Sequence, residues 1–171
     1  IEVTIPGTDK DTIYLANYYG NKLYYADTSV ADTKGKVIFR NPKGYKAGVY
    51  AVVIPGPKYF EVIVNEPVIK LSSDTVDLVG NLVVKTSVEN QVFLDYIRFL
   101  NTKKRESDAI KARMDAQKDP LARNGMRAQL EDLDKAVKKY QTDLIAANPH
   151  LLASALVRMS MSPELPEIRK P

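Results

Sequence analysis

The pattern of apolar and polar positions changes once along this chain, near residue 85. Before that point, apolar residues alternate with polar ones over short runs, which is the period of a β-strand with one buried face. Gly, Pro and Asn interrupt these runs at short intervals. After residue 85, apolar residues recur every three or four positions, which is the period of an amphipathic helix. The pattern therefore predicts a strand-rich first half and a helical second half.

Seven or eight short segments of the first half have the composition of strands. They are rich in Val, Ile, Tyr and Phe and bounded by turn residues, and they lie at 2–5, 12–19, 22–26, 37–40, 48–54, 60–64, 68–71 and 76–84. A parallel sheet needs long crossover connections, usually helical, and no helical segment precedes residue 87. Many short strands separated by turns are typical of a sandwich or a barrel. We predict an α+β protein whose first half is an antiparallel β-sandwich.

The second half predicts two long helices separated by a break. Ser87 is a suitable helix cap, with Asn90 as the alternative, and an apolar face at helical spacing follows over 92–100. Asp119-Pro120 ends this first helix, because proline disfavours helical backbone at the residue before it. The same dipeptide suits the start of a second helix, with the aspartate as cap and the proline in the first turn.

The second helix carries a heptad-like seam of apolar residues, formed by Met126, Leu130, Leu133, Val137, Tyr140 and Leu144. Its shortness favours packing against the first helix as an αα-hairpin, and leaves a homodimer through 126–144 as the alternative. A short third helix is predicted after Asn148-Pro149. The chain thus divides into a β-sandwich at 1–85, a helical hairpin with a short helix at 86–160, and a Pro-rich linker at 161–171. We expect this linker to lead to a further domain.

Composition excludes several kinds of chemistry. The chain has no cysteine, so it holds no disulfide, thiolate metal site or thiol nucleophile. The net charge of +4 arises in the helical half, where both signs are mixed, whereas nucleic-acid binders carry a stripe of one sign. The only histidine, His150, has no nucleophile pattern near it. Because no hydrolase, Walker, dinucleotide or zinc signature occurs either, we expect no enzyme activity and no catalytic, cofactor or metal site in this chain.

The tyrosines are the candidate binding residues, since eight of the ten precede residue 60. Tyr18-Tyr19 and Tyr24-Tyr25 are adjacent pairs in predicted strands. Neighbouring strand residues point to opposite faces, so one member of each pair should point outward, near its counterpart across the Gly20-Asn21 turn. An exposed tyrosine cluster binds sugar rings or protein partners well. The alternative is cross-strand aromatic packing on a solvated face.

Several motifs together resemble a known exported module. They are Asp27-Thr28 after a strand, the Gly-Lys-Val-Ile-Phe run at 35–39, Gly48-Val49-Tyr50, and Ser87 followed by Asn90 at the start of a helix. This order resembles the N-terminal β-sandwich of thioredoxin-like thiol-disulfide oxidoreductases, often lipoproteins, from the bacterial cell envelope. Where that family has a glycine before the serine, this chain has threonine.

The resemblance implies a setting rather than a reaction. It places the chain in the periplasm or at the outer membrane, ahead of a thioredoxin-like domain that would lie beyond Pro171 and carry the redox Cys-x-x-Cys. The implied role is a non-catalytic module that binds or positions. Two alternatives are a carbohydrate- or protein-binding sandwich that uses Tyr18, Tyr19, Tyr24 and Tyr25, and a structural module that oligomerises through its helices.

Overall fold

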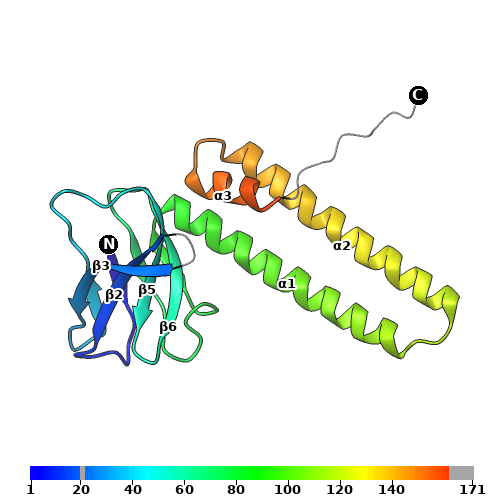
Figure 1. The fold of residues 1–171 in the computed structure, drawn as a ribbon, viewed down its shortest axis with the longest axis horizontal. Coiled ribbons are helices and arrows are strands. Elements are labelled where there is room, and N and C mark those ends of the chain that lie inside the picture. The colour runs from blue at the N-terminus through cyan, green and yellow to red at the C-terminus, as the bar shows by residue number, and fades with distance from the viewer. Residues whose placement is uncertain (20–21, 162–171) are drawn as a thin grey trace. The chain divides into compact units, whose positions relative to one another are not determined.

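The computed structural model describes residues 1–19 and 22–161, and within them eight strands precede three helices. The elements are β1 (Glu2–Thr4), β2 (Thr12–Tyr19), β3 (Lys22–Val30), β4 (Lys36–Ile38), β5 (Gly48–Ile54), β6 (Lys58–Val64), β7 (Lys70–Ser72), β8 (Val83–Thr86), α1 (Val88–Ala116), α2 (Pro120–Ala147) and α3 (Leu152–Ser160). Figure 1 shows this order along the chain. The predicted α+β class is confirmed. Two compact units form, a strand-rich unit at Ile1–Leu94 and a helical unit that begins at Asp95.

The strands make two four-stranded sheets, in the orders β4-β1-β7-β8 and β3-β2-β5-β6. All pairs in the second sheet are antiparallel, but β1 and β7 pair in parallel. The prediction of a purely antiparallel arrangement is therefore wrong for this pair. Parallel strands need a long crossover, and here the whole second sheet lies in the connection between them. The crossover between β1 and β7 therefore contains strands, whereas we expected that only helices would form such a connection.

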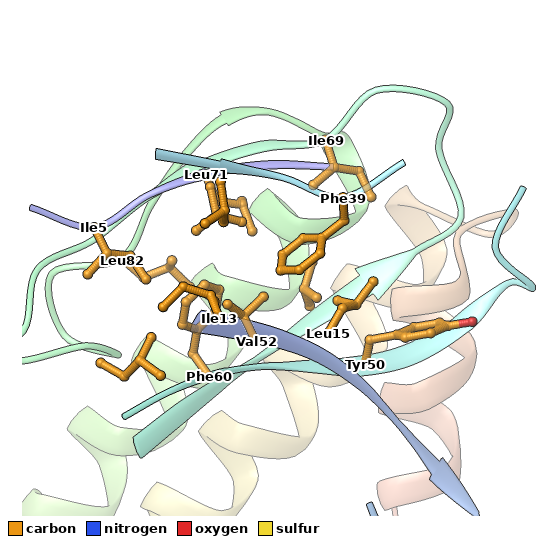
Figure 2. Packing of buried hydrophobic residues seen from close by; sticks show 14 of the residues in the cluster. Ile5, Ile13, Leu15, Phe39, Tyr50, Val52, Phe60, Ile69, Leu71 and Leu82 are labelled. Carbon is orange, nitrogen blue, oxygen red and sulfur yellow. The ribbon is translucent and has the colours of Figure 1, made fainter. Parts of the chain in front are cut away.

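Apolar side chains from both sheets meet in one buried cluster. Figure 2 shows Leu71 and Phe39 on one side of this core, with Ile13, Leu15 and Val52 facing them from the other. The alternation along β2 explains the arrangement, because every second residue of a strand points to the same face. Burial of such apolar surface contributes roughly 25 cal/mol per Å², so this cluster is the main source of stability in the strand-rich unit.

Two predicted strand boundaries are wrong by more than two residues. β3 runs on to Val30, beyond the predicted end at residue 26, and the segment 76–82 is a turn rather than part of a strand. The Asp74 carboxylate accepts the backbone N–H groups of Val76 and Asp77, both at 2.9 Å. Such bonds hold the backbone in a turn. They override an apolar pattern that otherwise resembles a strand.

The helical boundaries follow the sequence closely. Asp119 caps α2, since its carboxylate accepts the Leu121 N–H at 3.0 Å, as predicted. The ring of Tyr140 in α2 stacks on Phe99 in α1 with centroids 4.0 Å apart. The Gln141 amide also donates to the Tyr96 hydroxyl at 2.8 Å. These contacts place α1 and α2 against each other within the helical unit, as an αα-hairpin requires.

The seam on α2 is only partly covered in a single chain. Leu144 is buried, whereas the other seam residues, from Met126 to Tyr140, are half-buried. Homodimerisation through 126–144 stays a prediction, and light scattering on the purified chain is the measurement that checks it. Among the helices of the described part, none combines the length and apolarity needed to cross a bilayer.

Candidate functional site

The face of each tyrosine follows from the strand register. Leu15 of β2 pairs with Val52 of β5, and both side chains lie in the core. Their strand neighbours therefore point to the opposite side of the sheet, which we call the outer face. Tyr14 and Tyr18 of β2 lie there, one residue and three residues from Leu15.

A β-bulge decides the face on β3. Ala16 pairs with Tyr25, but Leu15 pairs with Asp27, so two residues of β3 stand opposite one of β2. This extra residue changes which side chains point outward beyond it. Tyr25 shares the outer face with Tyr14 and Tyr18. Tyr24, its neighbour along the strand, points to the other side.

The four candidate tyrosines therefore do not form one surface. Tyr18 and Tyr25 lie on the outer face, Tyr24 is exposed on the opposite face, and the Tyr19 side chain and the Gly20-Asn21 turn lie outside the described part of the structure. We use the name tyrosine face for Tyr14, Tyr18, Tyr25 and Tyr59. Tyr59 belongs to it because it pairs with Val53 of β5, which in turn pairs with Tyr14.

Two of these rings form a stack between neighbouring strands. The centroids of Tyr14 and Tyr25 lie 4.4 Å apart, with 23° between the ring planes. Tyr25 is nevertheless 66% exposed, so the face of its ring that does not contact Tyr14 is open to solvent. Stacked aromatic pairs stabilise a sheet by about 0.5–1.5 kcal/mol. The pair is thus a rigid aromatic platform and a cross-strand contact at once.

Tyr18 reaches further across the same face. Its hydroxyl donates to Glu61 Oε1 at 2.9 Å, although β5 separates β2 from β6. Strands two apart are roughly 10 Å from each other, so the Tyr18 ring must lie across β5. Ala51, which pairs with Glu61, is fully buried there. Its small side chain leaves room for the ring.

Among the tyrosines with a raised pKa, Tyr18 and Tyr45 share two causes, burial and a hydrogen bond to a carboxylate. Burial is the largest cause of the raised pKa of Tyr18, and the hydrogen bond to Glu61 raises this pKa further. Burial is also the largest cause of the raised pKa of Tyr45, and its hydrogen bond to Asp27 raises this pKa further. Both phenols are held in the neutral form beside a carboxylate, because ionisation would place two negative charges together.

We expect these two phenols to titrate late. Their folded pKa values exceed the unfolded value of about 10, so their contribution to stability is complete below that pH and is lost as the pH rises through the folded values. In the folded chain, absorbance at 295 nm should show a phenol fraction that ionises at higher pH than in the urea-unfolded chain. Glu61→Gln should lower the pKa of Tyr18 and reduce this fraction, whereas Glu131→Gln on α2 should not. A single titration near pH 10 for all phenols would contradict the Tyr18–Glu61 contact.

A second polar site fixes the start of α1 to the edge of β6. The Asn90 amide donates to the Ile63 carbonyl at 2.8 Å, and its oxygen accepts the Ile63 N–H at 2.8 Å. β6 is an outer strand of its sheet, and its free edge would otherwise carry unpaired backbone groups. The asparagine side chain therefore takes the place of a neighbouring strand at this point.

Glu66 and Ser87 complete this junction. The Ser87 hydroxyl accepts the Asn90 N–H at 3.0 Å, which confirms the predicted cap; the alternative of Asn90 as the cap is wrong. Glu66 accepts the Ser87 hydroxyl and, at 2.9 Å, the Val88 N–H. A carboxylate is favourable at a helix N-terminus because of the helix dipole. We call Ile63, Glu66, Ser87 and Asn90 the helix clasp.

Sequence reasoning identified only half of the helix clasp. Ser87 has a local signal, because a serine before a helical pattern is a common cap. Glu66 and Ile63 lie more than 20 residues earlier in the chain, and no spacing rule connects them to the helix. The buried Glu89, which accepts the Asn65 amide at 2.7 Å, was also missed.

The tyrosine face and the helix clasp consist of aromatic, hydroxyl, amide and carboxylate groups. No three His, Asp or Glu side chains of that part converge as metal ligands would. His150 lies exposed between α2 and α3. Comparisons with protein-family models, curated proteins and solved structures found no match for this chain.

Proposed function

We propose that this chain is a non-catalytic module that positions a further domain. The helix clasp is the observation that supports this most directly. It joins the edge of β6 to the first turn of α1 through backbone, hydroxyl, amide and carboxylate groups. Leu94, one turn further on, packs into the core cluster of the strand-rich unit. A helix fixed in this way is suited to carry whatever follows it.

The length of α1 sets the distance over which it would position a further domain. The helix has 29 residues, and at 1.5 Å per residue it spans roughly 40 Å. By the motif resemblance, the domain that it serves is thioredoxin-like, and the setting is the periplasm or the outer membrane of a bacterium. In this chain, Ser87 and Asn90 of the resembling motif both belong to the helix clasp. Their contacts in the helix clasp explain these two residues of the motif without a catalytic role.

We further propose that the two sheets form a β-sandwich. Support comes from the core, where Phe39 and Leu71 on one side and Ile13 and Val52 on the other belong to one cluster. Two sheets that share a core in this way bury their inner faces and leave their outer faces for recognition. The sandwich would then be the rigid body from which α1 begins.

The positioning role requires that the start of α1 stay fixed to the strand-rich unit. Because the chain has no cysteine, Thr33→Cys with Val88→Cys gives two unique sites for spin labels. We expect a narrow distance distribution between the labels, broadened by Ser87→Ala, which removes the cap and a donor to Glu66. Ser107→Ala, in the middle of α1, is the matched control and should leave the distribution narrow. An unchanged distribution in Ser87→Ala would contradict the proposal, as would tyrosine- or carboxylate-dependent turnover of disulfide or ester substrates by the purified chain.

The tyrosine face favours a second candidate function, saccharide binding. An open aromatic ring stacks well on the apolar face of a pyranose, and Tyr25 provides such a ring on the rigid Tyr14 stack. On a glycan array, Tyr25→Ala should weaken binding about 2- to 10-fold. Tyr24→Ala is the matched control, since it removes the neighbouring tyrosine on the opposite face. Absence of any glycan signal, or equal losses in both variants, would contradict this function.

A further inference from the structure

The outer face of the first sheet differs sharply in chemistry from the tyrosine face. Val3, Val37 and Leu71 point into the core, so their strand neighbours Glu2, Lys36 and Lys70 lie on the outer face. The register brings them together, since Glu2 pairs with both Ile38 and Lys70. Charged residues are therefore concentrated here on neighbouring strands.

Positive charge dominates this face. Glu2 forms an ion pair with Lys36 at 3.1 Å, and this contact is the first cause that lowers the pKa of Glu2. The charges of Lys70 and Lys85 lower it further. Three lysines therefore act on a single carboxylate, and only one of them is bound to it. We call Lys36, Lys70, Lys85 and Arg40 the cationic patch.

A groove of about 800 Å³ opens beside the patch, lined among others by Ile38, Arg40, Tyr45, Glu66, Val68 and Lys70. Neither the Arg40 nor the Lys70 side chain has a carboxylate partner within 4 Å among the described residues. Glu66 is already engaged by Ser87 and Val88. The groove thus presents unpaired cations together with exposed apolar side chains, of which Val68 is 50% exposed.

We propose that the groove and the cationic patch bind an acidic, extended polypeptide segment of a partner protein. The cations lie on or beside β4, β7 and β8 rather than around one point, which matches carboxylates spaced along a chain better than a single anion. Ile38, Val68 and Tyr45 form apolar walls for a side chain between those carboxylates. Charge complementarity of this kind selects partners and speeds their association. The surface belongs to the strand-rich unit and does not depend on the positioning role.

The test uses the 171-residue chain and a fluorescein-labelled peptide in which glutamates alternate with leucine and serine. Fluorescence anisotropy should show binding at low ionic strength that weakens as salt is added. Arg40→Gln with Lys70→Gln should weaken it about 5- to 10-fold. Lys22→Gln on β3 is the matched control and should leave binding unchanged, and a peptide with glutamine in place of glutamate should bind more weakly.

Three results would overturn the proposal: no binding of the acidic peptide at low salt, equal losses in the control and the double variant, or binding of anionic phospholipid vesicles or inorganic phosphate in its place. Because Arg40, Lys70 and Lys22 are exposed, the double variant and the Lys22→Gln control should keep the circular dichroism spectrum and the midpoint of unfolding of the parent chain. That check separates a loss of binding from a loss of fold. The spin-label experiment on the helix clasp is independent of all these outcomes.

Discussion

Phe39→Ala is expected to destabilise the strand-rich unit by about 3–5 kcal/mol, which is the usual cost of removing a buried phenylalanine ring. Phe39 is 1% exposed and belongs to the buried cluster to which both sheets contribute (Figure 2). Its backbone is held in place, since its N–H donates to the Ile1 carbonyl at 2.9 Å. The chain around it therefore has little freedom to collapse into the space that the ring leaves. Loss of transfer free energy and an unfilled cavity then add together.

Urea unfolding followed by tyrosine fluorescence and circular dichroism would measure this effect. The two units need not unfold together, so the transition of the strand-rich unit is the one to compare. Val76→Ala is the control, because Val76 is 88% exposed and should change the free energy of unfolding by less than about 0.5 kcal/mol. A Phe39→Ala effect of less than about 1 kcal/mol would mean that the two sheets do not share a tightly packed core.

The features that the sequence predicts well are those with local causes. Ile13 and Leu15 alternate with polar or outward residues, so the period of β2 and its buried side follow from a few neighbouring positions. Asp119-Pro120 marks a helix boundary by backbone geometry alone, and Ser87 does so by its hydroxyl. In each case the residues that decide the structure lie within one turn or strand of each other.

The features that it does not predict depend on distant residues or on one extra residue. The parallel β1–β7 pair joins segments more than 60 residues apart. The turn at 76–82 contains apolar residues that resemble a strand, but hydrogen bonds to the Asp74 and Asp77 carboxylates hold its backbone in a turn. The bulge opposite Leu15 has no clear sequence signal. It nevertheless determines which side chains of β2 and β3 lie on the same face as Tyr25.

The candidate site shows the same division. Strand alternation predicts that one tyrosine of each pair points outward, and Tyr18 and Tyr25 do so. The bond from Tyr18 to Glu61 could not be predicted, because the two residues lie on β2 and β6, which are not neighbours but flank β5 on either side. The same is true of the cationic patch, whose lysines come from three separate strands of one sheet, β4, β7 and β8.

Asn90 is the residue whose replacement tests the helix clasp most directly. Asn90→Ala should destabilise the strand-rich unit by about 2–4 kcal/mol, since it leaves the buried Ile63 N–H and C=O without partners and each such loss costs about 1–3 kcal/mol. Asn90→Asp should not rescue the loss at neutral pH. Its carboxylate still accepts the Ile63 N–H but also faces the Ile63 carbonyl, where the donor is gone and a buried charge is repelled.

Hydrogen exchange at the Ile63 amide separates this explanation from general loss of packing. In the parent chain, that amide should exchange slowly, because Asn90 protects an edge of the sheet that has no other strand beside it. Asn90→Ala should remove the protection locally, under conditions in which the Val52 amide in the middle of the sheet stays protected. Asn101→Ala, at an exposed position on the same helix, should change neither stability nor exchange. If the Ile63 amide stayed protected in Asn90→Ala, this protection would not come from the Asn90 side chain. That result would contradict the contact between α1 and β6 on which the positioning role of α1 depends.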